Sequence, residues 1–119
     1  MLPPLPSLVE AQRLLDAGRP FHAHEILEGT WKAAPEQERD LWQGLAQLAV
    51  GMTHLLRGNP AGATTLLQRA RRRVARYADD PPYGIDAAGL VAWADTALTG
   101  LAAGELPQPA PPQLRDSEG

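Results

Sequence analysis

The sequence predicts an all-α protein, a single antiparallel bundle of four to five helices followed by a disordered proline-rich tail. Alanine and leucine are abundant and β-branched residues are sparse, a composition that favours helices. Apolar residues recur at steps of three and four, and no alternating run of apolar and polar residues is long enough for a strand. We expect one domain over residues 1–105 and an extended or disordered tail over residues 106–119.

Capping signals predict the first two helices. Ser7 begins a capping-box pattern, so the first helix is expected over residues 7–17, and Gly18 follows where a left-handed residue closes a helix. Pro20 suits the first turn of a second helix. We expect that helix over residues 20–34.

The third helix, expected over residues 36–57, has the clearest core stripe. Small or apolar residues also occupy much of its remaining circumference, so we expect it at the centre of the bundle. The turn GNPAGA over residues 58–63 combines a glycine C-cap, an asparagine N-cap and a proline at the first helical position. It predicts that a fourth helix, over residues 60–77, packs antiparallel to the third. The stripe consists of Leu41, Leu45, Leu48, Met52 and Leu55.

The last part of the chain contains one more helix and the tail. Asp86 is an expected N-cap for a fifth helix that reaches Ala103. From Leu106 onward the sequence LPQPAPPQLRDSEG contains four prolines and shows no periodicity. Such a composition buries too little apolar surface to order itself, which is why we expect disorder there.

Composition limits the classes of function. The formal net charge is −3, which does not favour nucleic acid or anionic lipid as a partner. The chain has no cysteine, so disulfides and thiolate metal sites are excluded. The N-terminus has no basic region of the kind that precedes a secretory signal. No window has the roughly 18 consecutive apolar residues of a membrane span. We therefore expect a soluble, cytoplasmic protein with no membrane partner.

The segment FHAHEILEGTW, residues 21–31, has the densest functional chemistry. At about 100° per residue on a helix, His22 points to a different side from the other polar residues. His24 and Glu28 are four residues apart, close enough for a hydrogen bond or for binding one ion together. The residues that share one side are Phe21, His24, Glu25, Glu28 and Trp31.

A matching polar face is predicted on the third helix. Gln43, Gln47 and His54 gather on one side beside Gly44 and Gly51, which suggests a close helix contact with a polar seam. If the second and third helices meet there, the seam forms one cluster against an aromatic wall of Phe21 and Trp31. The predicted cluster consists of His24, Glu28, Gln43, Gln47 and His54.

Three ordered motifs, HEILEGTW, WQGLAQLAVGMTH and GNPAGA, resemble the small helical proteins catalogued as domain of unknown function 309. The resemblance spans about residues 14–77 and implies an all-helical antiparallel bundle, without an established activity. Family members often have an acidic residue where this chain has His22, so a site that needs a third carboxylate there is not expected. The positions that follow the family pattern are His24, Glu25, Leu27, Glu28, Trp31, Gln43, Gly44, Gln47, Gly58, Asn59, Gly62 and Ala63.

One interpretation of the dense segment is a metal site. His24-Glu25-x-x-Glu28 is close to the zincin motif H-E-x-x-H but ends in glutamate. His24 and Glu28 would hold a divalent ion with His54 as a third ligand, and Glu25 would act as general base of a hydrolase-like enzyme. The pattern also arises by chance in helices rich in glutamate.

The simpler interpretation is a buried hydrogen-bond network, since a His and a Glu beside aromatic residues need partners and the glutamines supply them. The function that we prefer from the sequence is therefore a non-catalytic protein whose polar seam supports the fold or binds a small ligand or partner. The exposed part of the first or fifth helix is a candidate surface for a homo-oligomer.

A run of arginines in the fourth helix, RARRRVAR over residues 69–76, indicates a solvated helix face. No aromatic residue alternates with these arginines to stack on bases, so the run does not predict a nucleic-acid site. The arginines are Arg69, Arg71, Arg72, Arg73 and Arg76.

Overall fold

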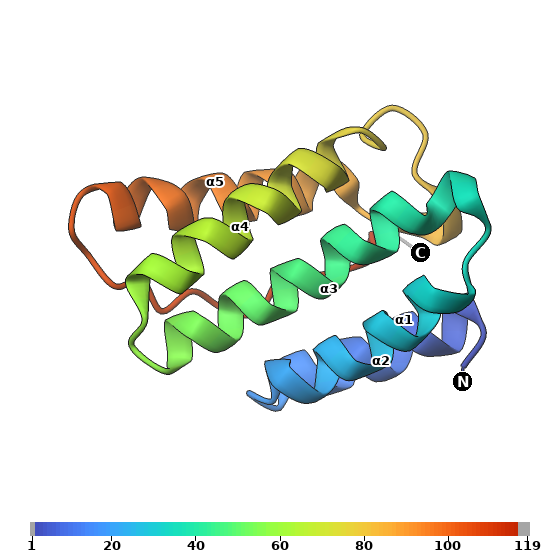
Figure 1. Ribbon diagram of the computed structural model, residues 1–119, viewed down its shortest axis with the longest axis horizontal. Coiled ribbons are helices and arrows are strands. Elements are labelled where there is room, and N and C mark those ends of the chain that lie inside the picture. Colours follow the sequence, from blue (N-terminus) through green and yellow to red (C-terminus); the bar gives the residue numbers. More distant parts are fainter. Residues whose placement is uncertain (1, 117–119) are drawn as a thin grey trace.

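The computed structural model describes residues 2–116 and has five α-helices and one short 3₁₀ helix in that range (Figure 1). The prediction of an all-α fold is confirmed. The described residues contain no strand beyond an isolated antiparallel bridge between Ile85 and Arg115, and no helix among them is both long and apolar enough to cross a bilayer. The elements are α1 (Pro4–Asp16), α2 (Pro20–Ala33), α3 (Glu36–Leu56), α4 (Pro60–Ala75), η1 (Pro82–Gly84) and α5 (Ala87–Ala102).

Helices that are consecutive in the sequence pack as antiparallel neighbours, α1 on α2, α2 on α3, α3 on α4 and α4 on α5 (Figure 1). The α3 helix lies between the α1–α2 pair and the α4–α5 pair. Its predicted stripe from Leu41 to Leu55 is buried in the core, as the sequence pattern indicates for a central helix.

Glycines bring α3 and α4 into close contact. A Cβ atom added at Gly51 would lie 2.6 Å from Leu67 Cδ2, and one added at Gly44 would lie 3.0 Å from Arg73 Cβ. The small-residue face was considered as a contact with the second helix, whereas in the structure it lies against α4. A helical wheel orders residues around one helix but does not say which neighbour covers each side.

The capping signals are confirmed at two helices. The side chains of Asn59 and Asp86 accept hydrogen bonds from the backbone three residues later, at 3.1 and 3.0 Å. The start of α1 differs from the prediction, because the helix begins at Pro4 and Ser7 lies buried inside it. Proline is compatible with the first helical turn, so the prolines before Ser7 do not delay the helix.

The C-terminal segment is extended, and it packs against the bundle. We call residues 107–116 the strap, and it runs back along the helices from the end of α5 (Figure 1). Pro112 and Leu114 are buried, and Leu114 is only 1% exposed. The prediction of disorder rested on composition and did not include these two anchors. Residues 117–119 of the predicted tail lie outside the described residues.

Candidate functional site

A shallow groove of about 200 Å³ opens between α2 and α3, with one residue of α4 at its edge. We call it the α2–α3 groove. Four of the five residues of the predicted polar cluster line it, together with one half of the predicted aromatic wall and three aliphatic side chains. Its lining consists of His24, Glu28, Trp31, Gln43, Ala46, Gln47, Val50 and Leu66.

His24 and Glu28 form the predicted pair on α2. Nε2 of His24 lies 2.9 Å from Oε2 of Glu28, so this nitrogen is the one that donates a proton to the carboxylate. The other ring nitrogen, Nδ1, is buried and has no hydrogen-bond partner among the described residues. Of the two ring nitrogens of His24, only Nε2 therefore has a hydrogen-bond partner among the described residues.

Glu28 is held in its ionised form. Its second oxygen, Oε1, lies 3.1 Å from Nζ of Lys32. The hydrogen bond from Lys32, together with the charge of His24, lowers the pKa of Glu28 below its ordinary value, although partial burial opposes this shift. The Glu28 side chain is 37% exposed. The sequence prediction of a buried carboxylate is thus not met, and Glu28 presents a negative charge at the rim of the groove.

The glutamines of α3 do not close the His24–Glu28 pair. Oε1 of Gln47 accepts a hydrogen bond from Nε of Arg73 on α4 at 3.1 Å. The structure records no hydrogen bond between the Gln43 side chain and another described residue. The single polar network that the sequence predicted is therefore two separate sets, one along α2 and one between α3 and α4.

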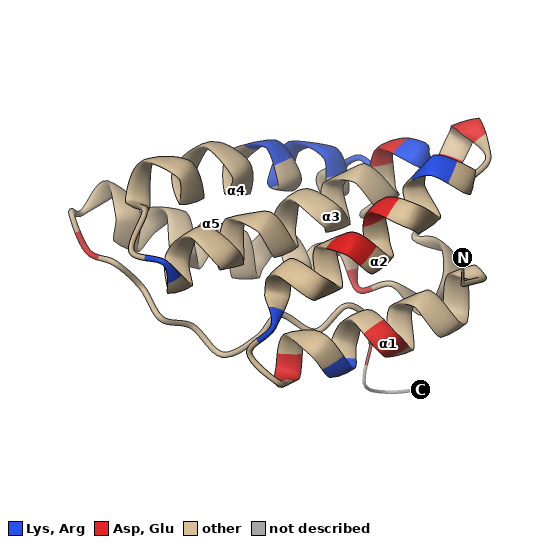
Figure 2. Ribbon diagram, turned by 60° about the horizontal axis from the view of Figure 1, so that its bottom comes forward, with Lys and Arg blue, Asp and Glu red and all other residues tan. Residues whose placement is uncertain are grey.

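Asp40 is the centre of the second set, and the sequence analysis did not identify it. Its carboxylate pairs with Arg73 and also with Arg76, whose Nη1 lies 2.7 Å away. Figure 2 shows the basic positions of α4 close to charged positions at the beginning of α3. Asp40 lies one helical turn before Gly44, where an added Cβ atom would lie 3.0 Å from Arg73 Cβ, so the close approach of the two helices brings the carboxylate within reach of the Arg73 guanidinium.

One further arginine and the fifth predicted seam residue have other partners. Arg71 pairs with Asp95 on α5, so three of the five arginines in the run over residues 69–76 have acidic partners within the protein. His54 lies at the α3–α4 turn, where its Nδ1 is 3.1 Å from Nδ2 of Asn59. His54 is not among the residues that line the α2–α3 groove.

The predicted aromatic wall is divided. Trp31 lines the α2–α3 groove, and the guanidinium of Arg39 lies 5.7 Å from its ring. Phe21 is 44% exposed and instead borders a second hollow beside Arg57, whose guanidinium lies 5.7 Å from the phenyl ring. Phe21 remains in contact with the His24 ring, at 5.5 Å between ring centroids.

The three-ligand metal site of His24, Glu28 and His54 is not assembled. Within residues 2–116, no three or more His, Asp and Glu side chains form a group that could hold a metal ion. His54 is drawn to Asn59 by the geometry of the turn. Glu25, the predicted general base, is exposed and is not among the residues that line the groove.

The sequence pattern of a family described as "Domain of unknown function (DUF309)" matches residues 8–66 of this chain. The resemblance inferred from the three motifs is confirmed over just under half of the chain. All eight residues that line the α2–α3 groove fall within the matched range. The strap lies outside it.

One curated relative is an uncharacterized protein, YpuF, of Bacillus subtilis (strain 168). It is 45% identical to this chain over 53 residues, which are 44% of this chain and 30% of YpuF. The chain therefore spans less than a third of the length of that relative. No solved structure matches the chain significantly.

Proposed function

We propose that this chain is a non-catalytic ligand-binding protein whose α2–α3 groove takes a small amine or guanidinium group. The observation that carries the proposal is the meeting of three features in one groove. Glu28 presents an ionised carboxylate at the rim, the Gln43 carboxamide has no hydrogen-bond partner among residues 2–116, and the rest of the lining is mainly apolar. A few polar groups on an apolar surface are typical of a ligand site.

The charge of the groove selects the class of ligand. Glu28 attracts a cation. The Trp31 ring, against which the Arg39 guanidinium already lies at 5.7 Å, is a surface of the kind that stabilises an ammonium or guanidinium group. Lys32, the present partner of Glu28, is 64% exposed. An exposed pair of this kind contributes little energy, so a ligand cation replaces Lys32 at low cost.

The size of the groove limits the ligand. Its volume is about 200 Å³. It is smaller than the range of about 300–1,000 Å³ in which drug-sized ligands bind. The groove therefore suits a group such as butylguanidinium, with its alkyl chain against Ala46, Val50 and Leu66.

A titration with butylguanidinium followed by protein NMR tests the proposal. We expect shifts of the Trp31 indole and the Gln43 side-chain amide, and loss of binding in Glu28→Gln. The control variant is Glu25→Gln, which removes an equal charge from α2 outside the groove, and butyrate is the control ligand. If Glu25→Gln weakens binding as much as Glu28→Gln does, the cation is attracted by the general charge of α2 and the proposal is wrong.

A further inference from the structure

The strap makes the contacts of a bound peptide. It has no helix of its own, and its recorded backbone hydrogen bonds go to other parts of the chain. Trp93 Nε1 on α5 donates to the Ala110 carbonyl at 2.8 Å. An indole N–H that meets a carbonyl in a proline-rich extended segment is the kind of contact by which aromatic grooves recognise such peptides.

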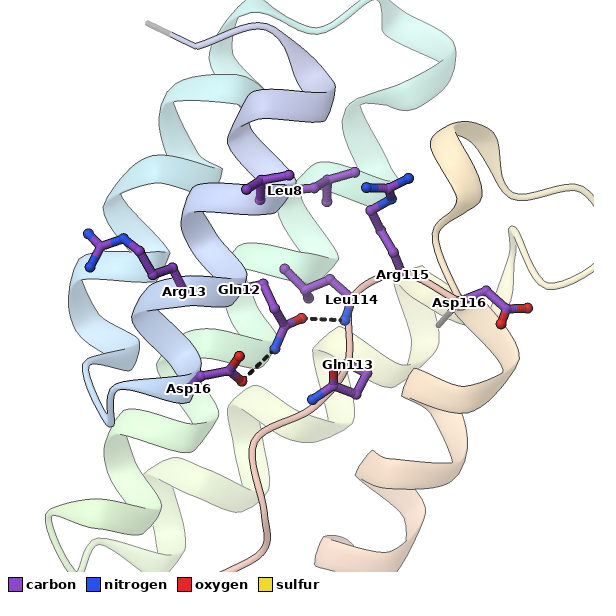
Figure 3. A pocket seen from close by; sticks show the side chains of 9 residues that line it. Leu8, Gln12, Arg13, Asp16, Gln113, Leu114, Arg115 and Asp116 are labelled. Carbon is purple, nitrogen blue, oxygen red and sulfur yellow. Dashed lines mark hydrogen bonds between the residues drawn. The ribbon is translucent and has the colours of Figure 1, made fainter. Parts of the chain in front are cut away.

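The side chain of Gln12 on α1 both donates to and accepts from the backbone of the strap, as a neighbouring β-strand would. Its Nε2 donates to the Pro112 carbonyl at 3.0 Å, and its Oε1 accepts from the Leu114 amide at 2.8 Å. Figure 3 shows the carboxamide of Gln12 pointing at the strap between Asp16 and Leu114. Asp16 accepts a second hydrogen bond from Nε2 at 2.9 Å, which fixes the orientation of the amide.

Leu114 is the second of the two buried anchors of the strap, after Pro112. Its side chain is 1% exposed, and its carbonyl accepts from the Asp86 amide at 2.9 Å. Asp116 N–H donates to the Gly84 carbonyl, also at 2.9 Å. The strap therefore sits in a seat, which we define as Gln12, Trp93 and residues 84–86. It is held there by hydrogen bonds to its backbone and by the buried side chains of Pro112 and Leu114.

The segment before the strap is suited to act as a hinge. Residues 102–106 are all exposed, and Gly104 has a φ of +84°. Rotation here separates the strap from α5 without uncovering a core residue of the hinge itself. The strap and its seat are thus two complementary surfaces joined by an exposed connection.

We propose that the seat is a peptide-binding site for the strap of a second copy of this chain, so that two copies associate by exchanging straps. A second copy is favoured over an unrelated peptide because exchange retains every contact of the strap. An unrelated peptide instead competes with a tethered segment whose effective concentration is on the order of millimolar. Exchange of an identical element is an established low-cost route to a dimer.

A complementation experiment with two full-length variants tests this. Leu114→Asp damages the strap and leaves the seat intact, whereas Gln12→Ala with Trp93→Phe damages the seat and leaves the strap intact. Sedimentation and native mass spectrometry should show that the mixture forms a heterodimer at least tenfold more tightly than either variant associates with itself. Circular dichroism verifies that both variants are folded, and Leu114→Ala replaces Leu114→Asp if the aspartate variant is not.

A peptide provides the second arm. We expect a synthetic peptide of residues 107–116 to bind the Leu114→Asp chain, while the same peptide with alanine in place of Leu114 binds at least tenfold more weakly. Absence of both heterodimer and peptide binding would overturn the proposal. Equal association in all combinations of variants would also overturn it, since the contact would then involve another surface, such as the exposed apolar side chains of α1.

Discussion

The hydroxyl oxygens of Ser7 on α1 and Thr30 on α2 lie 2.5 Å apart, and neither residue is more than 3% exposed. Ser7 Oγ is also 3.1 Å from the Leu2 carbonyl, and Thr30 Oγ1 is 3.2 Å from the Ile26 carbonyl. Two hydroxyl groups carry two protons, so they cannot donate in all three contacts at once. One hydroxyl must donate to the other, which in turn donates to a carbonyl, and the two residues are energetically coupled.

This coupling predicts the result of a double-mutant cycle. We expect Ser7→Ala and Thr30→Val each to lower the free energy of unfolding by about 1 kcal/mol, because each removes one buried hydrogen bond between α1 and α2. The double variant should lose less than the sum of the two, since the second substitution removes no further inter-helix bond. Urea denaturation of the four proteins measures the cycle. Strictly additive losses would show that the two hydroxyl groups do not interact.

The helices could be predicted from the sequence because their signals are local. Asn59, Asp86, Gly18 and Gly58 lie within one turn of the helix ends that they define. Ser7 shows the limit of such signals, because its spacing fits a capping box while its actual partner, Thr30, is 23 residues away. Local spacing does not distinguish a cap from a buried contact.

The site and the strap could not be predicted in the same way, because both are formed by contacts between residues that are far apart in the sequence. Helical periodicity groups residues on one side of a helix, but the choice of Arg73 as the partner of Gln47, or of Asn59 for His54, follows from the way the helices pack. The tail was expected to be extended or disordered on the ground of its composition. Its ordered packing depends on Gln12, which lies 102 residues before Leu114. Composition contains no information about such a partner.

The close α3–α4 contact predicts opposite effects for two glycine substitutions. Replacing a glycine inside a helix with alanine normally stabilises by about 0.5–1 kcal/mol. At Gly51 the new methyl group would meet buried Leu67 atoms at 2.6 and 2.8 Å. We therefore expect Gly51→Ala to destabilise the protein by about 1–3 kcal/mol, the usual cost of overpacking a core.

Gly29 provides the matched control within α2, since nothing lies within 4 Å of an added Cβ there. Gly29→Ala should raise the melting temperature, while Gly51→Ala should lower it, and thermal denaturation by circular dichroism measures both. A Gly51→Ala variant as stable as the wild type would mean that Leu67 moves aside freely and that the α3–α4 contact is looser than described.

The two polar sets predict different losses of stability when the acidic residue of each set is replaced with alanine. Glu28 is 37% exposed and its partner Lys32 is 64% exposed, so Glu28→Ala should cost less than about 1 kcal/mol. Asp40 is 22% exposed and pairs with Arg73, itself 26% exposed, so Asp40→Ala should cost about 1.5–3 kcal/mol, in the range of hydrogen bonds to charged groups. Urea unfolding at neutral pH ranks the two variants. The reverse order would mean that the buried network predicted from the sequence is centred on Glu28 after all.

The contribution of Glu28 also has a definite pH dependence. Its pKa is lowered in the folded protein by the hydrogen bond from Lys32 and by the charge of His24. A carboxyl group of this kind stabilises the fold above its ordinary pKa of 4.5, and this stabilisation is lost as the pH falls through the lowered value. The small difference between wild type and Glu28→Ala should therefore disappear in acid. A difference that persists at the lowest pH where the protein is folded would assign the effect to packing of the side chain.

Tyr83 predicts a loss of stability in base. Its hydroxyl donates to Glu38, with both carboxylate oxygens 3.0 Å away. This hydrogen bond is the main reason that the pKa of Tyr83 is raised above 10.0, and partial burial and the charge of Glu38 act in the same direction. Ionisation would remove the donated proton and place two negative charges side by side.

The sign of the effect follows from linkage. Unfolded tyrosine ionises near pH 10, so the stabilisation by Tyr83 is complete below that pH and is lost as the pH rises through the raised folded pKa. Tyr83→Phe should cost about 1.5–3 kcal/mol at neutral pH, because the lost bond has a charged acceptor, and the difference from wild type should vanish in strong base. Because the chain has two tyrosines, the Tyr77→Phe variant isolates the ultraviolet titration of Tyr83. We expect its midpoint above pH 10, and a midpoint at or below 10 would mean that the Tyr83–Glu38 hydrogen bond does not form in solution.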